Sequence, residues 1–128
     1  MGEETGYRIF LVEDDEVIAR EISQFLAGWG LETQCAEDFL NVLEQFQEWK
    51  PQLVLMDISL PFHNGFYWCQ EIRKQSEVPV VFLSSAADNM NIVMAMNMGG
   101  DDFIAKPFDR NVLLAKLQAI LRRTYHYA

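Results

Sequence analysis

Short apolar runs alternate along the chain with longer stretches in which apolar residues recur every three or four positions. The short runs are typical of buried strands, and the longer stretches are typical of helices with one apolar face. Their strict alternation predicts an α/β fold, in which helices cover both faces of a doubly wound parallel sheet. The five expected strands are Tyr7–Val12, Glu32–Ala36, Gln52–Met56, Pro79–Leu83 and Asp102–Ala105, and the five helical stretches are Val17–Leu26, Phe39–Trp49, Phe66–Arg73, Ile92–Met96 and Val112–Leu121.

Composition is typical of a compact globular domain. Half of the 128 residues are hydrophobic, and 19 acidic against 10 basic side chains give a formal charge of −9. A chain of this length folds without disulfides or a structural metal, so we expect residues 1–128 to form one domain. The acidic balance argues against direct binding to nucleic acid, which needs a basic patch. The sequence shows no apolar run that could span a bilayer and no signal segment, so we expect a cytoplasmic protein without membrane insertion.

Polar side chains stand where four of the expected strands end. Three carboxylates, at 13–15, follow the first strand, and Asp57 follows the third. Ser84 follows the fourth strand and Lys106 follows the fifth. Because the carboxyl ends of parallel strands lie at one edge of the sheet, where doubly wound folds bind their ligands, we expect these groups to converge.

The expected cluster has a definite chemistry. Carboxylates held close together repel one another unless a cation lies among them. Mg²⁺ suits such a site because it takes one or two protein carboxylates, keeps several waters and coordinates a phosphoryl oxygen; Mn²⁺ is the alternative ion. Asp57, at the centre of the edge, is a candidate nucleophile. Lys106 would neutralise charge on a transferring phosphoryl group and Ser84 would hydrogen-bond one of its oxygens, so the pattern indicates phosphoryl transfer onto Asp57.

Each of these residues also has an ordinary structural explanation. Asp14 or Asp15 would cap the helix that follows, because aspartate is a preferred residue there. Ser84 would be a loop hydroxyl and Lys106 a surface lysine. For any one residue the ordinary explanation is the better one, but four strand ends with complementary groups together favour a functional site.

Several motifs in the chain together point to a known family: LVEDD at 11–15, LMDISLP at 55–61, Gly65, Ser84 with Ser85, and GDDFIAKPF at 100–108. Through them the chain resembles the receiver domain of bacterial two-component response regulators, from about Tyr7 to Arg123. Residues 99–108 and the helix ending in LRR at 121–123 look most like regulators that carry a winged-helix DNA-binding domain after the receiver. GFYWC at 65–69 and LQAILRR at 117–123 are similar to Gram-positive regulators of resistance to bacitracin and other antimicrobial peptides.

The resemblance implies a flavodoxin-like fold with strand order 2-1-3-4-5 and phosphorylation of Asp57 by a sensor histidine kinase. It implies Mg²⁺ ligands as well: the side chains of Asp14 and Asp57, Glu13 through a water, and the backbone carbonyl of Ser59. The implied activity is that of a signalling switch, with magnesium-dependent autophosphorylation and slow autodephosphorylation, more than that of an enzyme with a turnover substrate.

The resemblance also implies a switch. Lys106 would pair with the phosphoryl group, and the Lys106–Pro107 peptide bond would be cis. Ser84 would move toward the phosphate and Phe103 would turn inward with it. Ser84 stands where the family usually has threonine and Phe103 where it frequently has tyrosine. Neither change removes a group that the chemistry requires.

Family members commonly form a symmetric dimer through the face made by the helix Ile92–Met96, the strand Asp102–Ala105 and the helix Val112–Leu121. Acidic and basic residues would pair across the two-fold axis, where each contact occurs twice. The ordinary explanation is that these charges are solvated and worth little. The implied dimer residues are Ile92, Asp101, Asp102, Val112, Lys116 and Arg123.

Three hypotheses for function follow. The leading one is the receiver of a longer transcription regulator, with 1–6 disordered or tag-like, 124–128 opening a linker, and DNA contacted only by a further domain beyond it. The second is a stand-alone metal-dependent phosphatase with an aspartyl-phosphate intermediate, although Ser59 stands where such enzymes usually place a second acid. The third is a diffusible receiver that acts as an adaptor.

Overall fold

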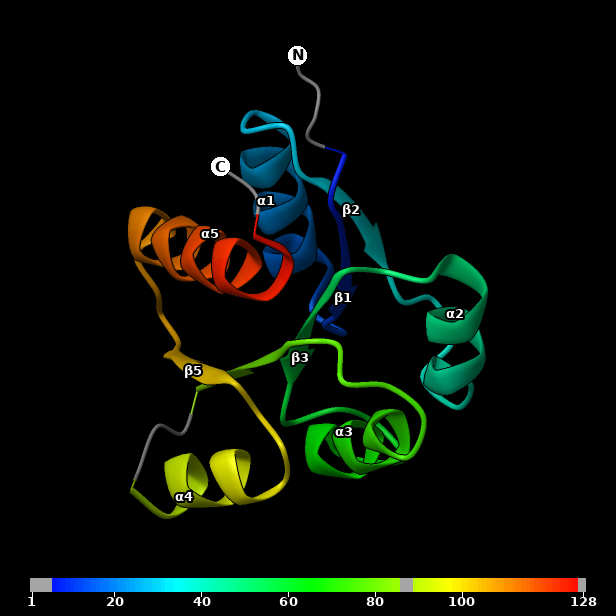
Figure 1. Ribbon diagram of the computed structural model, residues 1–128. Helices are drawn as coiled ribbons and strands as arrows, with labels where there is room; N and C mark the ends of the chain where they lie inside the picture. The colour runs from blue at the N-terminus through cyan, green and yellow to red at the C-terminus, as the bar shows by residue number, and fades with distance from the viewer. Residues whose placement is uncertain (1–5, 86–88, 127–128) are drawn as a thin grey trace.

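The computed structural model describes residues 6–85 and 89–126, and within these ranges five parallel strands form one sheet of order β2-β1-β3-β4-β5 (Figure 1). This arrangement confirms the predicted doubly wound fold and its strand order. The strand boundaries differ from the predicted ones by no more than one residue. The strands are β1 (Arg8–Val12), β2 (Glu32–Cys35), β3 (Leu53–Asp57), β4 (Val80–Ser84) and β5 (Asp102–Ala105).

Helices lie on both faces of the sheet, as Figure 1 shows. The side chains of α1 and α5 pack in the core on one face, and those of α2, α3 and α4 pack in the core on the other. No helix in the described ranges is long and apolar enough to cross a membrane. The helices are α1 (Glu16–Ala27), α2 (Val42–Trp49), α3 (Gly65–Arg73), α4 (Asn89–Asn97) and α5 (Arg110–Tyr125).

The central strands are buried on both faces, which explains their continuous apolar sequences. In β1, Ile9 and Leu11 belong to the core beneath α1 and α5, whereas Phe10 and Val12 belong to the core beneath α2 and α3. All four side chains are fully buried. The sheet is therefore a firmly packed platform, and its carboxyl edge positions the residues that follow each strand.

Helix caps fix the loops at that edge. Asp15 caps α1, because its Oδ1 accepts hydrogen bonds from the backbone N–H groups of Val17 at 3.0 Å and Ile18 at 3.2 Å. Asp109 caps α5 in the same way, through two N–H groups of the first turn. Of the two neighbouring carboxylates that could cap α1, Asp15 does so, and Asp14 is left for another role.

Asp57 and Ser84 were expected just after strands, and both are instead the last residues of strands. In the parallel register Asp57 lies opposite Leu83 and Ser84 lies opposite Ala105. The backbones of both residues are thus held by sheet pairing. Their side chains are positioned more rigidly than loop residues would be.

The second helix is shorter than predicted. It begins at Val42, so Phe39 and Leu40 lie in the preceding loop. The carboxylate of Asp38 accepts a hydrogen bond from the N–H of Leu40 at 3.0 Å, and the amide of Gln45 donates to the carbonyl of Asp38 at 2.6 Å. Such local bonds compete with helix formation. Leu40 is consequently 55% exposed instead of packing in the core.

The last helix is longer than predicted. It continues through Tyr125, into the segment 124–128 that was expected to open a linker. The Tyr125 hydroxyl donates to the Gln52 carbonyl at 2.6 Å, and its ring centre lies 5.7 Å from that of Tyr7. Burial raises the pKa of Tyr125. Of residues 1–6, only Gly6 lies within the described ranges.

Candidate functional site

Three carboxylates meet at the carboxyl edge of the sheet. Glu13 and Asp14 follow β1, and Asp57 ends the adjacent strand β3. One carboxylate oxygen of each residue lies within 4.8 Å of those of the other two. Glu13 and Asp57 are each 4% exposed, whereas Asp14 is open to solvent. The structure therefore brings these three predicted site residues together.

Lys106 reaches the same place from the end of β5. Its Nζ lies 2.5 Å from Oε1 of Glu13 and 3.3 Å from Oδ1 of Asp57, and its side chain is only 13% exposed. The backbone N–H of Lys106 donates to the Ser84 carbonyl at 2.8 Å, and the Lys106–Pro107 peptide bond is cis, as the resemblance implied. Lys106 thus lies within the carboxylate cluster and is not an exposed surface lysine.

The burial and the charges of the cluster shift the pKa values of Asp57 and Lys106. Burial, followed by repulsion from Glu13, raises the pKa of Asp57 to about 6 although Lys106 acts against the shift. For Lys106, burial alone would lower the pKa, but the hydrogen bond from its ammonium to Glu13 and the charge of Asp57 outweigh burial and raise it. The lysine therefore stays protonated, and one ammonium faces two buried carboxylates.

The donor set fits a hard divalent cation. Mg²⁺ prefers carboxylate oxygens and keeps several waters, for which the exposed side of Asp14 leaves access. The backbone N–H of Asp15 donates to Oε2 of Glu13 at 3.1 Å, which helps to orient that carboxylate. Ser59 is exposed in the loop two residues beyond Asp57, and the role of its carbonyl as a ligand stays a prediction.

Gly65, known from the sequence only as part of a motif, has a specific steric role. A Cβ atom at this position would lie 2.3 Å from the backbone oxygen of Asp57. The N–H of Gly65 donates to the Ile58 carbonyl at 2.9 Å, so the loop after β3 folds back against the strand that it leaves. Glycine fits here because it has no Cβ atom and so lets another backbone segment approach closely.

The predicted switch residues occupy adjacent strands. Ser84 ends β4 and is 3% exposed. Phe103 in β5 is half-buried and packs against the core beneath α3 and α4. The movement of both residues on phosphorylation stays a prediction.

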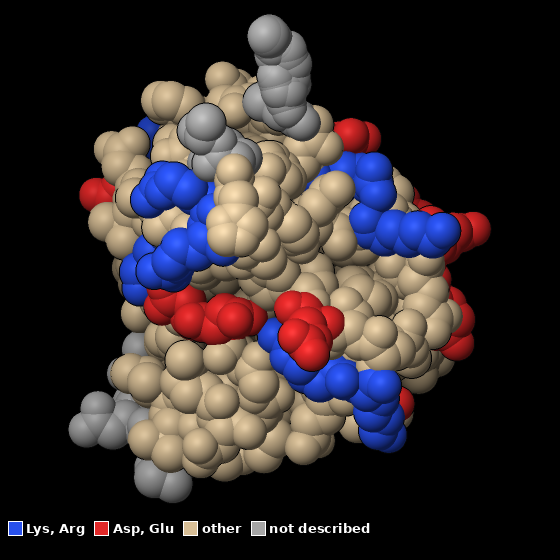
Figure 2. Space-filling model, viewed as in Figure 1, with Lys and Arg blue, Asp and Glu red and all other residues tan. Residues whose placement is uncertain are grey.

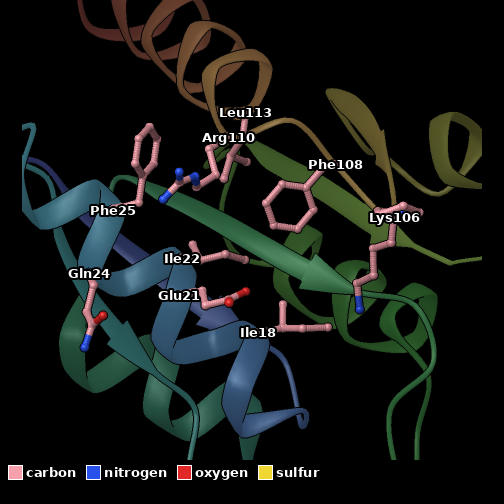
Figure 3. A pocket seen from close by; sticks show the side chains of 10 residues that line it. Ile18, Glu21, Ile22, Gln24, Phe25, Lys106, Phe108, Arg110 and Leu113 are labelled. Atoms are coloured by element: carbon pink, nitrogen blue, oxygen red, sulfur yellow. The ribbon is translucent and has the colours of Figure 1, made fainter.

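A groove of about 770 Å³ runs beside the carboxylate cluster, between α1 and the start of α5 (Figure 3). Lys106 contributes to one end of this groove, and Arg110 reaches across it, with its guanidinium carbon 5.3 Å from the ring centre of Phe25. Six of its ten lining residues are apolar and four are polar or charged. The groove is lined by Ile18, Glu21, Ile22, Gln24, Phe25, Lys106, Pro107, Phe108, Arg110 and Leu113.

The predicted dimer face combines exposed apolar residues with charges that already have partners. Ile92 and Val112 are 38% and 48% exposed. Asp102 pairs with Lys116 of the same chain at 3.3 Å. Figure 2 shows acidic groups gathered where β5 lies, with basic groups next to them over α5. Arg123 is exposed, and its pairing across a two-fold axis stays a prediction.

Arg73, which sequence reasoning took for an ordinary helix residue, organises the end of α4. Its Nε and Nη2 donate to the Gly99 carbonyl at 3.0 and 2.7 Å, and Nη1 donates to the Val78 carbonyl at 2.6 Å. Nη2 also contacts the Asp101 carboxylate at 2.9 Å, and the same oxygen accepts the N–H of Val80. The sequence signals a tight turn through the Gly99-Gly100 pair, but nothing local points to its partner on α3.

Comparison with known proteins agrees with this geometry. Residues 9–118 match the response regulator receiver domain family. The uncharacterized transcriptional regulatory protein YvcP of Bacillus subtilis is 50% identical over 119 residues, which are 93% of this chain and 50% of that protein. The response regulator protein GraR of Staphylococcus aureus is 45% identical over 120 residues, 94% of this chain and 54% of GraR. The chain thus spans about half the length of the curated relatives it matches.

Solved structures give the same result. The N-terminal domain of the nisin resistance regulator NsrR, a lantibiotic response regulator, has a TM-score of 0.85 at 47% identity and covers 93% of this chain and 100% of that chain. A two-component response regulator from Clostridium difficile has a TM-score of 0.88 at 28% identity, and the match covers 92% of this chain and 98% of that chain. The resemblance to receivers, and to regulators of antimicrobial-peptide resistance among them, is confirmed. The chain belongs to the response regulator receiver domain family.

Proposed function

We propose that this chain is the phospho-acceptor switch of a two-component system and takes a phosphoryl group from a sensor histidine kinase onto Asp57. One observation carries the proposal: Asp57 is buried beside Glu13, Asp14 and Lys106, three groups that together suit a metal ion and a phosphoryl group. Receiver domains act in partnership with such kinases.

Asp57 has to be ionised to act as a nucleophile. With a pKa of about 6, about nine tenths of it is carboxylate near pH 7. One carboxylate oxygen forms the new bond to phosphorus, the P–N bond to the donor histidine breaks, and its electron pair stays on the imidazole nitrogen. Mg²⁺ held by Glu13, Asp14 and Asp57 would supply positive charge for the phosphoryl oxygens. Lys106, with its ammonium 3.3 Å from Oδ1 of Asp57, would supply further positive charge for these oxygens.

The proposed switch begins with an exchange of partners. In the unphosphorylated structure the ammonium of Lys106 is closer to Glu13 than to Asp57. A phosphoryl group on Asp57 offers several charged oxygens, which are stronger acceptors than one carboxylate. Lys106 then turns toward the phosphoryl group, and the hydroxyl of Ser84 and the ring of Phe103 follow.

The groove between α1 and α5 is the proposed docking surface for the kinase. Lys106 lines the groove and also contacts Asp57, so a helix seated there lies directly beside the acceptor. The six apolar lining residues suit the apolar face of a helix, and the four polar or charged ones can discriminate among partners. Figure 3 shows Arg110 and Phe25 facing each other across the groove, where they can contact such a helix.

The proposed output is a dimer through the α4-β5-α5 face. The exposed side chains of Ile92, Val93, Met96 and Val112 supply an apolar centre for that contact. The carboxylates of Asp101 and Asp102 already form ion pairs within the chain. Charges at the edge of the dimer contact therefore help to orient the two copies more than they add to the affinity. The longer relatives suggest a DNA-binding domain after the receiver, and the nisin resistance regulator suggests a role in resistance to antimicrobial peptides.

A direct test uses a small phosphodonor. Incubation with acetyl phosphate and Mg²⁺ should add the mass of one phosphoryl group to the intact protein, and Asp57→Asn should abolish the addition. Chelation of Mg²⁺ should do the same. If the Asp57→Asn variant accepted the group as readily as the parent chain, Asp57 would not be the acceptor and the proposal would fail.

A further inference from the structure

The loop after Asp57 has an unusual surface. From Ile58 to Gln70 the chain carries no Asp, Glu, Lys or Arg, although these residues make up 23% of the whole chain, and His63 is the one histidine of the stretch. Within this stretch Phe62 is 70% exposed, which makes it the most exposed of the large hydrophobic residues in the described ranges. Tyr67 is 38% exposed, and His63 is exposed as well.

Phe62 is also strained. Its φ angle is +70°, in the left-handed region that a bulky side chain rarely adopts. Glycine would take this conformation without strain, and asparagine tolerates it. A large apolar ring in a strained conformation at the surface contributes neither to folding nor to solubility. Such an outlier is better explained by what the ring contacts when a partner is bound.

Two other exposed rings of this stretch stack on each other. His63 stacks on Tyr67 with ring centres 4.0 Å apart and an interplanar angle of 18°. His63 and Tyr67 both meet Trp68 edge-on, at 5.5 and 4.9 Å. Trp68 itself is 5% exposed and belongs to the core, as does half-buried Phe66. We call the three exposed rings, Phe62, His63 and Tyr67, the aromatic ledge.

The aromatic ledge is held close to Asp57. Gly65 packs directly against the backbone of Asp57, and the Oδ1 of Asn64 accepts the N–H of Tyr67 at 2.9 Å, which starts α3. Three peptide units separate Phe62 from Gly65, so their Cα atoms are no more than about 11 Å apart. Any protein that transfers a group directly to Asp57 must therefore come near this ledge.

We propose that the aromatic ledge is a second contact surface for the phosphoryl-donating kinase and selects it through contacts between its rings and apolar side chains. This inference rests on the proposed function. The groove lined by α1 and α5 lies toward one face of the sheet, whereas the ledge lies at the start of α3, on the other face of the same edge. A kinase that contacts both the groove and the aromatic ledge binds across the carboxyl edge of the sheet, with Asp57 between its two contacts. A charged partner group would lose its hydration against the rings of Phe62 and Tyr67 without gaining an ion pair there, so these rings favour apolar side chains.

The test separates protein donors from a small donor. Purified cytosolic portions of the histidine kinases of the source organism are first assayed as a panel, and the one that transfers fastest to the parent chain is used for the variants. Phe62→Gly removes the ring and relieves the strained φ, and Phe62→Asn is the second variant. Trp29→Ala is the matched control, because Trp29 is a 56% exposed aromatic residue in the turn before β2, at the opposite edge of the sheet.

We expect Phe62→Gly to keep or raise the melting temperature and to react with acetyl phosphate within twofold of the parent rate. With the kinase, kcat/KM should fall about tenfold or more, mainly through KM, because the ring contributes to binding and not to chemistry. Phe62→Asn should behave in the same way and Trp29→Ala should match the parent.

Several results would overturn the inference. One is unchanged transfer from the kinase to both Phe62 variants. Another is an equal loss with kinase and acetyl phosphate, which would assign the ring to the geometry of the site. Concentration-dependent dimers that disappear in Phe62→Gly would assign it to a second copy of the chain. If acetyl phosphate modifies Asp57 but no kinase does, this inference fails while Asp57 remains an acceptor; if neither does, the proposed function fails.

Discussion

Lys106 and Glu13 form the closest ion pair of the site, with Nζ and Oε1 2.5 Å apart and the Glu13 side chain only 1% exposed. Asp57 is the secondary partner of the lysine at 3.3 Å. A single ammonium thus serves two buried carboxylates. Removal of the Lys106 ammonium should therefore lower the stability of the fold more than the loss of an ordinary surface lysine does.

We therefore expect Lys106→Met to lower the free energy of unfolding by about 3 kcal/mol near pH 7 without Mg²⁺, because both carboxylates lose their counter-ion. Urea unfolding measures this. Lys74→Met is the control, since Lys74 is exposed and pairs with Glu71 on the surface, and it should cause no measurable change. Equal effects of the two substitutions would contradict the interpretation.

The raised pKa of Asp57 predicts that the stability of the fold depends on pH. Its pKa is about 6 in the folded chain against an ordinary 3.8, so the folded state prefers the protonated form and ionisation opposes folding. The penalty is absent below pH 3.8, grows up to about pH 6, and persists above it. Asp57→Asn should thus stabilise the metal-free protein by up to about 3 kcal/mol near pH 7 and by little near pH 4.

The comparison of Asp57→Asn with the parent chain at each pH is essential, because the Lys106–Glu13 pair responds to acid as well. Denaturant titrations at both pH values give the difference. Stabilisation of the same size at the two pH values would show that the burial of a carboxylate at Asp57 is not its cause. Added Mg²⁺ should shrink the difference near pH 7, because the ion stabilises the carboxylate.

The metal site can be tested through neighbouring aspartates. Mg²⁺ at a hundredfold excess over its Kd should stabilise the parent chain by about 3 kcal/mol. Asp14→Asn should abolish most of this response and leave the metal-free stability unchanged, because Asp14 is exposed. Asp15→Asn should keep the response, since asparagine also caps helices well. Thermal melts across a Mg²⁺ titration distinguish the two, and a reversed order would exclude the proposed ligand set.

Gly65 should not tolerate a side chain. In Gly65→Ala the new Cβ would meet the backbone oxygen of Asp57 at 2.3 Å, so the strand or the helix has to shift. We expect a loss of about 2–3 kcal/mol in stability and a large loss of acetyl phosphate reactivity. Gly28→Ala is the control, because its Cβ would meet only the Phe25 oxygen at 3.4 Å and its backbone is right-handed helical. Similar melting temperatures for the two variants would contradict this steric role.

Much of the fold and site could be predicted because parallel strands end at one edge. That rule alone placed Asp57 near Glu13 and brought Lys106 to both, since it depends on the order of elements and not on details of packing. The sequence could not predict which of the two aspartates caps α1, as Asp15 does, and which joins the carboxylate cluster, as Asp14 does. That assignment depends on where α1 begins to within one residue, and sequence patterns do not fix a helix start so closely.

Other features depended on interactions that periodicity does not record. Phe39 and Leu40 fit the helical period of α2, but the hydrogen bonds of Asp38 and Gln45 hold them in a loop. The bonds of Arg73 join α3 to distant backbone carbonyls, and only the folded chain brings these groups together. Local patterns thus predicted the elements, whereas such long-range contacts required the structure.

Trp68 gives the domain an optical property of its own. It is 5% exposed, its indole N–H has no partner within the described ranges, and it adjoins the rings of His63 and Tyr67 at the start of α3. Indole fluorescence depends on the surroundings of the ring, and these surroundings are tied to Asp57 through the loop that Gly65 pins. Trp29, exposed at the opposite edge, and Trp49 at the end of α2 emit as well, so their replacement isolates the emission of Trp68. We therefore expect metal binding and phosphorylation to change the intrinsic emission of Trp68, so that both can be followed without an attached dye.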